Sequence, residues 1–199
     1  MAAGRIIGLY EDNAAAWDRQ RSRRLIERTW LERFCAGLPP GGHVLDIGCG
    51  MGEPIAASLI ERGYVVTGVD SSPSLIRLCR ERFPTLEWIV ADMRAMELGR
   101  RFDGLLAWHS LFHLPPADQR PMFARFARHA ASNARLMFTS GTEEGSAIGE
   151  WQGEPLYHGS LDTGEYGRLL GGAGFEVINH VVADPACGHC TVWLAQHKR

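Results

Sequence analysis

The sequence has no apolar run long enough to cross a membrane and no excess of charge of either sign. A membrane helix needs about 18 or more consecutive apolar residues, and the apolar piece between Met1 and Tyr10 is far shorter. The 199 residues include 21 Lys and Arg and 23 Asp and Glu, a formal net charge of -2. Proteins that bind nucleic acid or an anionic membrane surface usually carry a basic face. We therefore expect a cytoplasmic protein with no membrane segment and no nucleic-acid partner.

Cysteines are few, and their number is odd. The five are scattered, and we expect no secretory leader, which favours a reducing compartment and free thiols. They are Cys35, Cys49, Cys79, Cys187 and Cys190. Repeats, low-complexity tracts and Pro- or Gly-rich linkers are also missing, so a single domain is expected over 1–199. Within it we expect a helical cap at 1–40 and a long loop at 141–161.

What the sequence has is a regular alternation of helical and strand-like segments. Apolar residues at three- and four-residue steps predict a helix over 10–37, which Gly37 and Pro39-Pro40 end. Strands are predicted at 43–47, 64–69, 86–90, 102–107, 134–139, 175–182 and 191–195. Further helices are predicted at 55–62, 72–83, 117–130 and 162–171. This alternation indicates a doubly wound α/β domain, a parallel sheet with helices on both faces. The last two strands are joined without a helix, so that pair must be antiparallel.

The strongest sign of a binding site is Val44-Leu-Asp-Ile-Gly-Cys-Gly-Met-Gly52, at the end of the first strand. Its three glycines allow a tight turn and a close approach of the backbone to a ligand. A plain turn between strand and helix is the alternative interpretation. The dinucleotide fingerprint G-x-G-x-x-G would need a glycine where Glu53 stands, and Asp46 would be a poor neighbour for a pyrophosphate. The motif therefore argues against a nicotinamide oxidoreductase and favours a less anionic ligand.

Two more carboxylates stand at the ends of the following strands, Asp70 after the second and Asp92 after the third. Ligands of open α/β sheets bind outside the carboxyl ends of the strands, so these acids and Asp46 are expected to converge on one crevice. Asp70 is suited to a ribose diol and Asp92 to an adenine amino group, with Ile76 and Met93 as apolar walls. Taken singly, each Asp is as well explained as a loop or helix-cap residue.

In these segments the chain resembles the class I S-adenosylmethionine (SAM)-dependent methyltransferases of the small-molecule type. The matching pieces are "VLDIGCGMG", "VTGVDSSPSLIRLCRERFP", "WIVADM" and "FDGLLAWHSLFHLPP". The order of elements agrees over nearly the whole chain. The resemblance implies SAM as the cofactor, S-adenosylhomocysteine (SAH) as the product, and a Rossmann-like sheet of seven strands with an antiparallel last strand. No metal is expected.

The resemblance also implies which residues contact SAM. At the strand ends these are Asp46, Gly48, Cys49, Gly50, Asp70, Ser71, Asp92, Met93 and Trp108. The glycine turn would line the methionine part of SAM, and Asp46 would lie beside the ammonium group of that part. The N-terminal helices of the family usually cover the cofactor, so Tyr10, Trp17 and Arg21 are candidates for closing the site. Core packing for Trp17 and solvent exposure for Arg21 are the alternatives.

Two histidines follow the fourth strand, where residues of this family often act. Methyl transfer needs mainly alignment and exclusion of water, and a base only if the acceptor must lose a proton. His109 is the main candidate for that base. His113 is a second candidate, although local packing explains it as well.

The segment 141–161 is long for a connection and rich in ring side chains. Long loops at an active face are often functional. Trp151, Tyr157 and His158 are therefore expected to form the acceptor-side wall, or else merely to pin the loop. We expect a methyltransferase that acts on a small, ring-containing metabolite, as a monomer or a homodimer. A non-catalytic module that binds an adenosyl ligand with the same fold is the alternative.

One stretch lies outside this interpretation, Ala186-Cys-Gly-His-Cys190. Cys-Gly-His-Cys is the active-site motif of protein disulfide isomerases, and two cysteines flanking a histidine could also bind zinc. A redox cysteine needs the start of a helix, and zinc needs further ligands. Here the stretch joins the last two strands, so we expect a hairpin turn, with His189 reaching the acceptor pocket as a remaining option.

Overall fold

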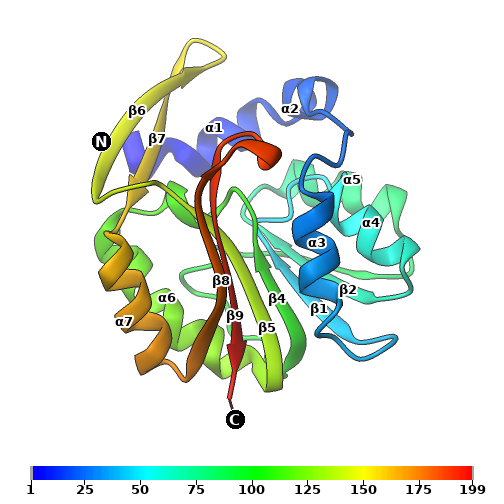
Figure 1. The fold of residues 1–199 in the computed structure, drawn as a ribbon. Coiled ribbons are helices and arrows are strands. Elements are labelled where there is room, and N and C mark those ends of the chain that lie inside the picture. Colours follow the sequence, from blue (N-terminus) through cyan, green and yellow to red (C-terminus); the bar gives the residue numbers. More distant parts are fainter. Residues whose placement is uncertain (1, 199) are drawn as a thin grey trace.

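The computed structural model describes residues 2–198 and contains a seven-stranded sheet and a two-stranded one. The strand order in the large sheet is β3-β2-β1-β4-β5-β9-β8 (Figure 1). The bounds are His43–Ile47 (β1), Val65–Asp70 (β2), Glu87–Val90 (β3), Phe102–Ala107 (β4), Ala130–Ser140 (β5), Phe175–Asp184 (β8) and Cys190–His197 (β9). Strands β1 to β5 pair in parallel, whereas β9 lies antiparallel between β5 and β8. This confirms the predicted doubly wound sheet with an antiparallel last strand.

Helices cover both faces of this sheet (Figure 1). One face carries α3 (Arg28–Cys35), α4 (Ile55–Glu61) and α5 (Pro73–Arg82), and the other carries α6 (Pro116–His129) and α7 (Thr163–Gly172). Successive side chains of a strand point to opposite faces. In β1, Val44 packs in the first layer, whereas Leu45 and Ile47 pack in the second. Two hydrophobic layers thus fix the positions of the strand ends.

Two of the helices begin where the sequence predicts, because a side chain caps the first turn. The Ser72 hydroxyl accepts a hydrogen bond from the backbone N–H of Leu75 at 3.1 Å, and Pro73 occupies the first turn. Asp162 accepts from the N–H of Glu165 at 2.9 Å. Such caps satisfy donors that the first turn leaves unpaired and contribute about 1 kcal/mol each. The cap at Ser72 also fixes the chain directly after β2.

The N-terminal segment is not one helix. A 3₁₀ turn at Ala2–Arg5 leads into α1 (Ile6–Asp12) and α2 (Ala14–Gln20), and residues 21–27 then run without a helix to α3. The prediction of a continuous helix over 10–37 is therefore wrong in its middle. The Arg23 guanidinium turns back and donates to the backbone carbonyls of Asp18 and Arg21, which ends α2.

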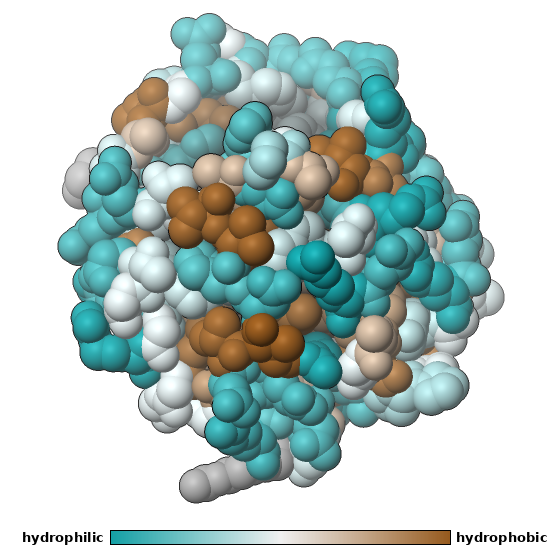
Figure 2. All heavy atoms as spheres, in the orientation of Figure 1, coloured by the Kyte–Doolittle hydropathy of each residue, from teal (hydrophilic) through white to brown (hydrophobic). Residues whose placement is uncertain are grey.

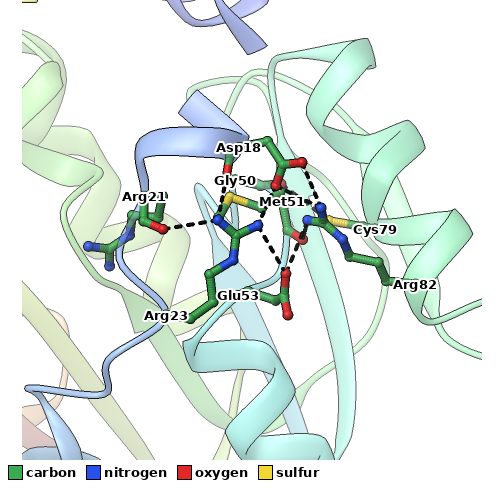
Figure 3. A network of polar contacts seen from close by, with 8 residues as sticks. All are labelled: Asp18, Arg21, Arg23, Gly50, Met51, Glu53, Cys79 and Arg82. Carbon is green, nitrogen blue, oxygen red and sulfur yellow. Dashed lines mark hydrogen bonds and ion pairs between the residues drawn. The ribbon is translucent and has the colours of Figure 1, made fainter. Parts of the chain in front are cut away.

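A network of ion pairs ties α2 to α5 and to the loop after β1 (Figure 3). Asp18 pairs with Arg82 and with Arg23, each at 2.6 Å. Glu53, which follows the glycine motif, pairs with Arg82 at 3.3 Å and with Arg23 at 3.5 Å. Arg82 also donates to the carbonyl of Met51 at 3.3 Å. Both arginines bridge the same two carboxylates, which holds α2 beside the glycine motif.

A second clamp joins α1 to the start of α5. Glu11 accepts hydrogen bonds from the hydroxyls of Ser72 and Ser74 at 2.5 and 2.7 Å, and from the backbone N–H of Ser74 at 3.0 Å. These donors lower the pKa of Glu11. The two clamps together hold α1 and α2 across the carboxyl ends of the strands (Figure 1).

Residues 141–161 are not a loop, contrary to the prediction. They contain β6 (Gly145–Trp151) and β7 (Glu154–Ser160), an antiparallel hairpin that lies beside α1 (Figure 1). Its turn residues, Gln152 and Gly153, have φ values of 57° and 75°, the pattern of a two-residue type I′ turn. Glycine at the second turn position is the local signal from which this hairpin could have been recognised.

The face of the molecule seen in Figure 2 is mostly hydrophilic, with two hydrophobic patches over the edge strand β8. The exposed apolar side chains of that strand are Val177, Ile178 and Val182. Within residues 2–198, no helix combines the length and the apolar character needed to cross a membrane.

We predict that Arg82→Gln loosens the N-terminal helices without unfolding the domain. The change removes the bridge between Asp18 and Glu53, and partly exposed ion pairs of this kind contribute up to about 1 kcal/mol. Trypsin should then cleave within 21–27 several times faster, while the melting temperature falls by only about 2–4 °C. The control is Arg77→Gln, which removes an exposed ion pair from the same helix. Equal cleavage rates in the two variants would contradict this anchoring role.

Candidate functional site

A cavity of about 330 Å³ opens at the carboxyl ends of β1 to β4. The glycine motif and the acids at the strand ends form one side of it, and α1, α2 and the β6–β7 hairpin contribute the other. Of the site and wall residues predicted from the sequence, all line this cavity except Tyr157 and Ile76, and the Ile76 side chain is fully buried in the core instead. The topology therefore brings together segments that lie far apart in the chain, while the role of each residue stays a prediction.

The glycine motif forms a turn that other residue types fit poorly. Gly48, Gly50 and Gly52 have φ values of 78°, 56° and 82°, all in the left-handed region. A Cβ on Gly48 would lie 2.3 Å from the Cβ of Ser110, so the turn is tightly packed on that side. At Gly50 the nearest atom to such a Cβ is Nε1 of Trp17, at 3.5 Å. The backbone at Gly50 therefore borders open space in the cavity.

Asp70 fastens this turn from the end of β2. Its Oδ2 accepts from the N–H of Gly50 and its Oδ1 from the N–H of Ser72, both at 2.9 Å. Burial raises the pKa of Asp70, and the backbone donors at Ser72, Gly50 and Ser71 offset only part of this effect. A carboxylate has about four lone-pair positions, so Asp70 retains acceptor capacity for hydroxyl groups of a ligand.

Asp46 is the least compensated acid of the site. Its side chain is only 4% exposed, and no hydrogen bond from another described residue reaches its carboxyl group. Burial, and second the charge of Asp70, raises the pKa of Asp46 to about 7. Buried charges are normally paired. A positively charged ligand group in the cavity would supply the missing partner and lower that pKa.

Asp92 is held by a neighbour instead. Arg94 donates from Nε at 3.0 Å and from Nη2 at 2.6 Å, and it also pairs with Asp118 at 2.9 Å. Hydrogen bonding from Arg94 lowers the pKa of Asp92. Met93 lies next to it on the cavity wall. Asp92 therefore has only part of its acceptor capacity left for a ligand.

Three aromatic rings from the N-terminal helices and the hairpin meet at the cavity. Tyr10 of α1 stacks on Trp151 at the end of β6, with ring centroids 5.5 Å apart and an interplanar angle of 29°. Trp17 of α2 meets both rings edge-on, at 5.2 and 5.5 Å. Burial raises the pKa of Tyr10 far above neutrality, so its hydroxyl stays protonated. These contacts join the hairpin to the N-terminal helices.

Arg21 lines the cavity at the end of α2 and has a buried counter-ion. Its Nη2 lies 3.7 Å from Oε1 of Glu27, whose side chain is 1% exposed. Within residues 2–198 neither carboxylate oxygen of Glu27 has a hydrogen-bond partner, and burial raises the pKa of that acid. The guanidinium also lies 5.9 Å from the ring centroid of Trp17. Arg21 is thus neither free in solvent nor fully neutralised.

His113 connects the N-terminal helices and the hairpin through two hydrogen bonds. Its Nε2 lies 3.0 Å from the Tyr10 hydroxyl and its Nδ1 lies 3.0 Å from the Tyr157 carbonyl. A carbonyl can only accept, so Nδ1 carries the proton and Nε2 accepts from Tyr10. Burial lowers the pKa of His113 to about 4. Both nitrogens are therefore engaged, which favours the packing interpretation of this residue over a base.

His109 has one ring nitrogen, Nδ1, that makes no hydrogen bond to another residue of 2–198. Its backbone N–H donates to the Thr139 hydroxyl at 2.9 Å, and its ring lies 5.4 Å from that of Trp108. Nε2 lies 3.6 Å from Sγ of Cys190, whereas Nδ1 has no hydrogen bond to any residue in the described part of the chain. Burial, followed by Arg21 and two neighbouring histidines, lowers the pKa of His109 to about 4. Its imidazole is therefore neutral at physiological pH.

The hairpin lines the cavity with alternate residues of β7. Leu156 and His158 lie on the wall, and Tyr157 between them does not. Successive side chains of a strand point to opposite faces. The expectation that the Tyr157 ring belongs to this wall is therefore not met, and Tyr157 contributes its backbone carbonyl to His113 instead.

Phe112 is a wall residue that the sequence did not reveal. Its ring contacts those of His109, His113 and His158, with centroids 5.7, 4.8 and 4.9 Å apart. The only available signal was its place directly after β4, in the same segment as the two candidate histidines. An apolar ring thus lies among three imidazoles at this end of the cavity.

The stretch Ala186 to Cys190 forms the predicted turn between β8 and β9. A 3₁₀ turn at Pro185–Cys187 is followed by Gly188 and His189 in the left-handed region, with φ values of 61° and 59°. Both thiols are free, and nowhere in residues 2–198 are three His, Cys, Asp or Glu side chains arranged to hold a metal. His189 does not line the cavity, whereas Cys190 contacts the cavity residue His109.

Comparison with known proteins adds to this geometry. Residues 44–133 match a family model described as a methyltransferase domain. Trans-aconitate 2-methyltransferase of Azoarcus sp. (strain BH72) is 34% identical over 119 residues, which are 57% of this chain and 46% of that protein. The chain spans about half the length of the curated relatives it matches.

Two solved structures share the architecture. Magnesium protoporphyrin IX methyltransferase from Synechocystis PCC 6803, with bound SAM, has a TM-score of 0.76 at 14% identity, covering 100% of this chain and 98% of that one. The 1,6-didemethyltoxoflavin-N1-methyltransferase of Burkholderia thailandensis has a TM-score of 0.72 at 21% identity, covering 99% and 87%. At these identities the likeness shows the fold, a seven-stranded sheet between two helical layers.

We predict that nuclear magnetic resonance will find His113 in its Nδ1–H tautomer, with no titration between about pH 5.5 and 8. The reason is the pair of hydrogen bonds to Tyr10 and Tyr157, together with the pKa near 4 that burial imposes. Long-range ¹H–¹⁵N spectra report both properties. An Nε2–H tautomer, or a pKa above 6, would contradict the assigned hydrogen bonds.

Proposed function

We propose that the chain is a class I SAM-dependent methyltransferase that transfers the methyl group of SAM to a small, ring-containing molecule. The observation that carries this proposal is the cavity in which Asp46, an acid with no hydrogen-bond partner among residues 2–198, stands beside a glycine turn. A pyrophosphate would bring negative charge to Asp46, whereas SAM brings a sulfonium and an ammonium group. The charge of the site therefore favours SAM over a dinucleotide.

The residues present fit SAM in its three parts. Asp46 would pair with the ammonium group, and Arg21 with the carboxylate of the methionine moiety. Asp70 would accept hydrogen bonds from the ribose hydroxyls, and the wall at Asp92 and Met93 would receive the adenine. The open space beside Gly50 is the room that the ligand needs, since a Cβ there would fill it. When bound, SAM supplies an electrophilic methyl group on a positively charged sulfur.

The protein contributes alignment, exclusion of water and proton handling. Tyr10, Trp17 and Trp151 cover the cavity, so an acceptor would be held out of bulk water. Nδ1 of His109 is available to take a proton from the acceptor, and a pKa near 4 makes this imidazole a weak base. His113 is engaged in two hydrogen bonds and orients the Tyr10 ring. A monomer or homodimer and a cytoplasmic location stay predictions.

Isothermal titration calorimetry tests the proposal. The protein is expected to bind SAM and SAH, and to bind NAD⁺ far more weakly. SAH affinity should rise with pH through about 7, because the ligand ammonium favours the ionised form of Asp46 and that acid is protonated below its pKa in the free protein. In Asp46→Asn this dependence should disappear. Binding of NAD⁺ in preference to SAH would contradict the proposal.

A matched pair of glycine variants controls that experiment. Gly50→Val places a branched side chain in the space beside the turn and should abolish SAH binding. Gly167→Val adds the same side chain at an open position of α7, outside the cavity, and should leave binding unchanged. Circular dichroism of both variants separates a blocked site from a misfolded protein. Tight SAH binding by Gly50→Val would show that the ligand lies elsewhere.

The role of His109 as a base predicts a specific pH profile, measurable once an acceptor is in hand. His109→Asn should lower turnover by about 10²-fold, the lower end of the range for a general base, because its pKa is so far below neutrality. The acidic limb of the rate profile should fall near pH 4 in the wild type and be absent in the variant. If the limb persists and only acceptor affinity changes, His109 is a wall residue instead.

A further inference from the structure

The part of the cavity beyond the glycine turn is walled by uncharged side chains. Its walls come from α1, from the segment after β4 and from the β6–β7 hairpin. Six residues carry the argument: Ile6, His109, Phe112, Trp151, Leu156 and His158. A molecule bound there meets aliphatic groups, aromatic faces and imidazoles. Such walls suit a flat apolar body with a few polar atoms.

The charged groups of the cavity are paired with each other or, on the proposed function, with SAM, and this includes Arg21, whose charge also acts on His109. Among the described residues that line it, the charged ones are Arg21, Asp46, Glu53, Asp70, Asp92 and Arg94. Arg94 is engaged by two acids, Asp92 and Asp118. Arg21 pairs with Glu27 and, on the proposed function, also with the methionine carboxylate of SAM. An anionic acceptor would therefore find no cation of its own and would face a surplus of acids.

The imidazoles do not make up for that lack of positive charge. Burial lowers the pKa of His109 to about 4 and also lowers the pKa of His158, so both rings are neutral at pH 7. Nδ1 of His109 and both ring nitrogens of His158 have no hydrogen-bond partner within residues 2–198. A neutral imidazole offers one donor and one acceptor. That pair matches a hydroxyl, a ring nitrogen or an amide better than a carboxylate.

The rings also define the shape of the space. Phe112 lies between the two imidazoles, 5.7 Å from His109 and 4.9 Å from His158 between centroids. Trp151 stands on the hairpin side of the same cavity, stacked on Tyr10. Aromatic faces bind other planar rings with a gain beyond the area they bury. The same wall residues therefore favour an acceptor that is both planar and uncharged.

We propose that the methyl acceptor is an uncharged planar ring compound, bound against Phe112 and Trp151 with its polar atoms on His109 and His158, and that carboxylate-bearing acceptors are rejected. This rests on the proposed function, because SAM must occupy the other part of the cavity. It goes further in excluding a class of acceptor, the organic acids.

Matched probes test this selectivity. The protein is first saturated with SAH, and its SAH affinity is recorded. It is then titrated calorimetrically with 8-hydroxyquinoline and its 2-carboxylate, with catechol and 3,4-dihydroxybenzoate, and with trans-aconitate. In each ring pair the neutral member is expected to bind at least about tenfold more tightly, the ratio expected for one unpaired charge in a poorly hydrated site. No heat is expected from trans-aconitate.

Two variants of the hairpin sharpen the test. Leu156→Arg places a cation on the acceptor wall and should reverse the preference, so that the carboxylate members bind more tightly than the neutral ones. Ile148→Arg adds the same charge to the other strand of the hairpin, at an exposed side chain outside the cavity, and should leave the preference unchanged.

The outcomes separate this inference from the proposed function. Failure to bind SAH would overturn the proposed function itself. Normal SAH binding with tighter binding of the carboxylate members, or of trans-aconitate, overturns the neutral-acceptor inference alone. So does the absence of binding by every ring probe up to about 10 mM, a concentration at which even weak ligands of about 3 kcal/mol are detected.

Discussion

Two acids, the buried Asp46 and the half-buried Asp70, lie at the ends of adjacent strands, and much of the site follows from this constraint. Burial raises the pKa of both, and the charge of Asp70 raises the pKa of Asp46 further. Asp70 is partly compensated by the backbone donors of Gly50 and Ser72, which requires the left-handed glycine turn. For Asp46, no hydrogen bond from another residue in 2–198 provides such compensation. The placement of these two acids therefore determines the shape of the glycine turn, and it favours a ligand with a positive charge near Asp46.

The N-terminal helices and the hairpin turn this strand-end crevice into a covered cavity. Ion pairs hold α2 against α5, and Glu11 clamps α1 to the serines at the start of α5. Glu53 has a double significance, because it stands where a dinucleotide fingerprint would need its third glycine and it also anchors the cover through Arg82 and Arg23. The residue that argues against a pyrophosphate thus helps to close the site. Tyr10 and Trp151 complete the cover from two segments that no local pattern links.

Features that depend on local chemistry could be predicted from the sequence, whereas those that depend on distant partners could not. The succession of strands and helices along the chain, the glycine turn and the acids at the strand ends follow from hydrophobic alternation and from residue types at fixed positions. The break at 21–27 depends on Arg23 reaching back to α2, and the contact of Cys190 with His109 joins residues 81 positions apart. Side chains alternate between the two faces of β7, which places Leu156 in the cavity wall and Tyr157 outside it. This alternation could be predicted only if the hairpin were recognised first. The depressed pKa of His109 depends on burial that only the fold reveals.

A crystal structure of the protein with SAH tests the central claim most directly. The account predicts the amino group of SAH within hydrogen-bonding distance of Asp46 and the ribose hydroxyls on Asp70. It also predicts the adenine beside Met93 and the sulfur facing the part of the cavity bounded by His109 and Phe112. A ligand bound in the opposite direction, with adenine among those rings, or a ligand bound outside this cavity, would contradict it.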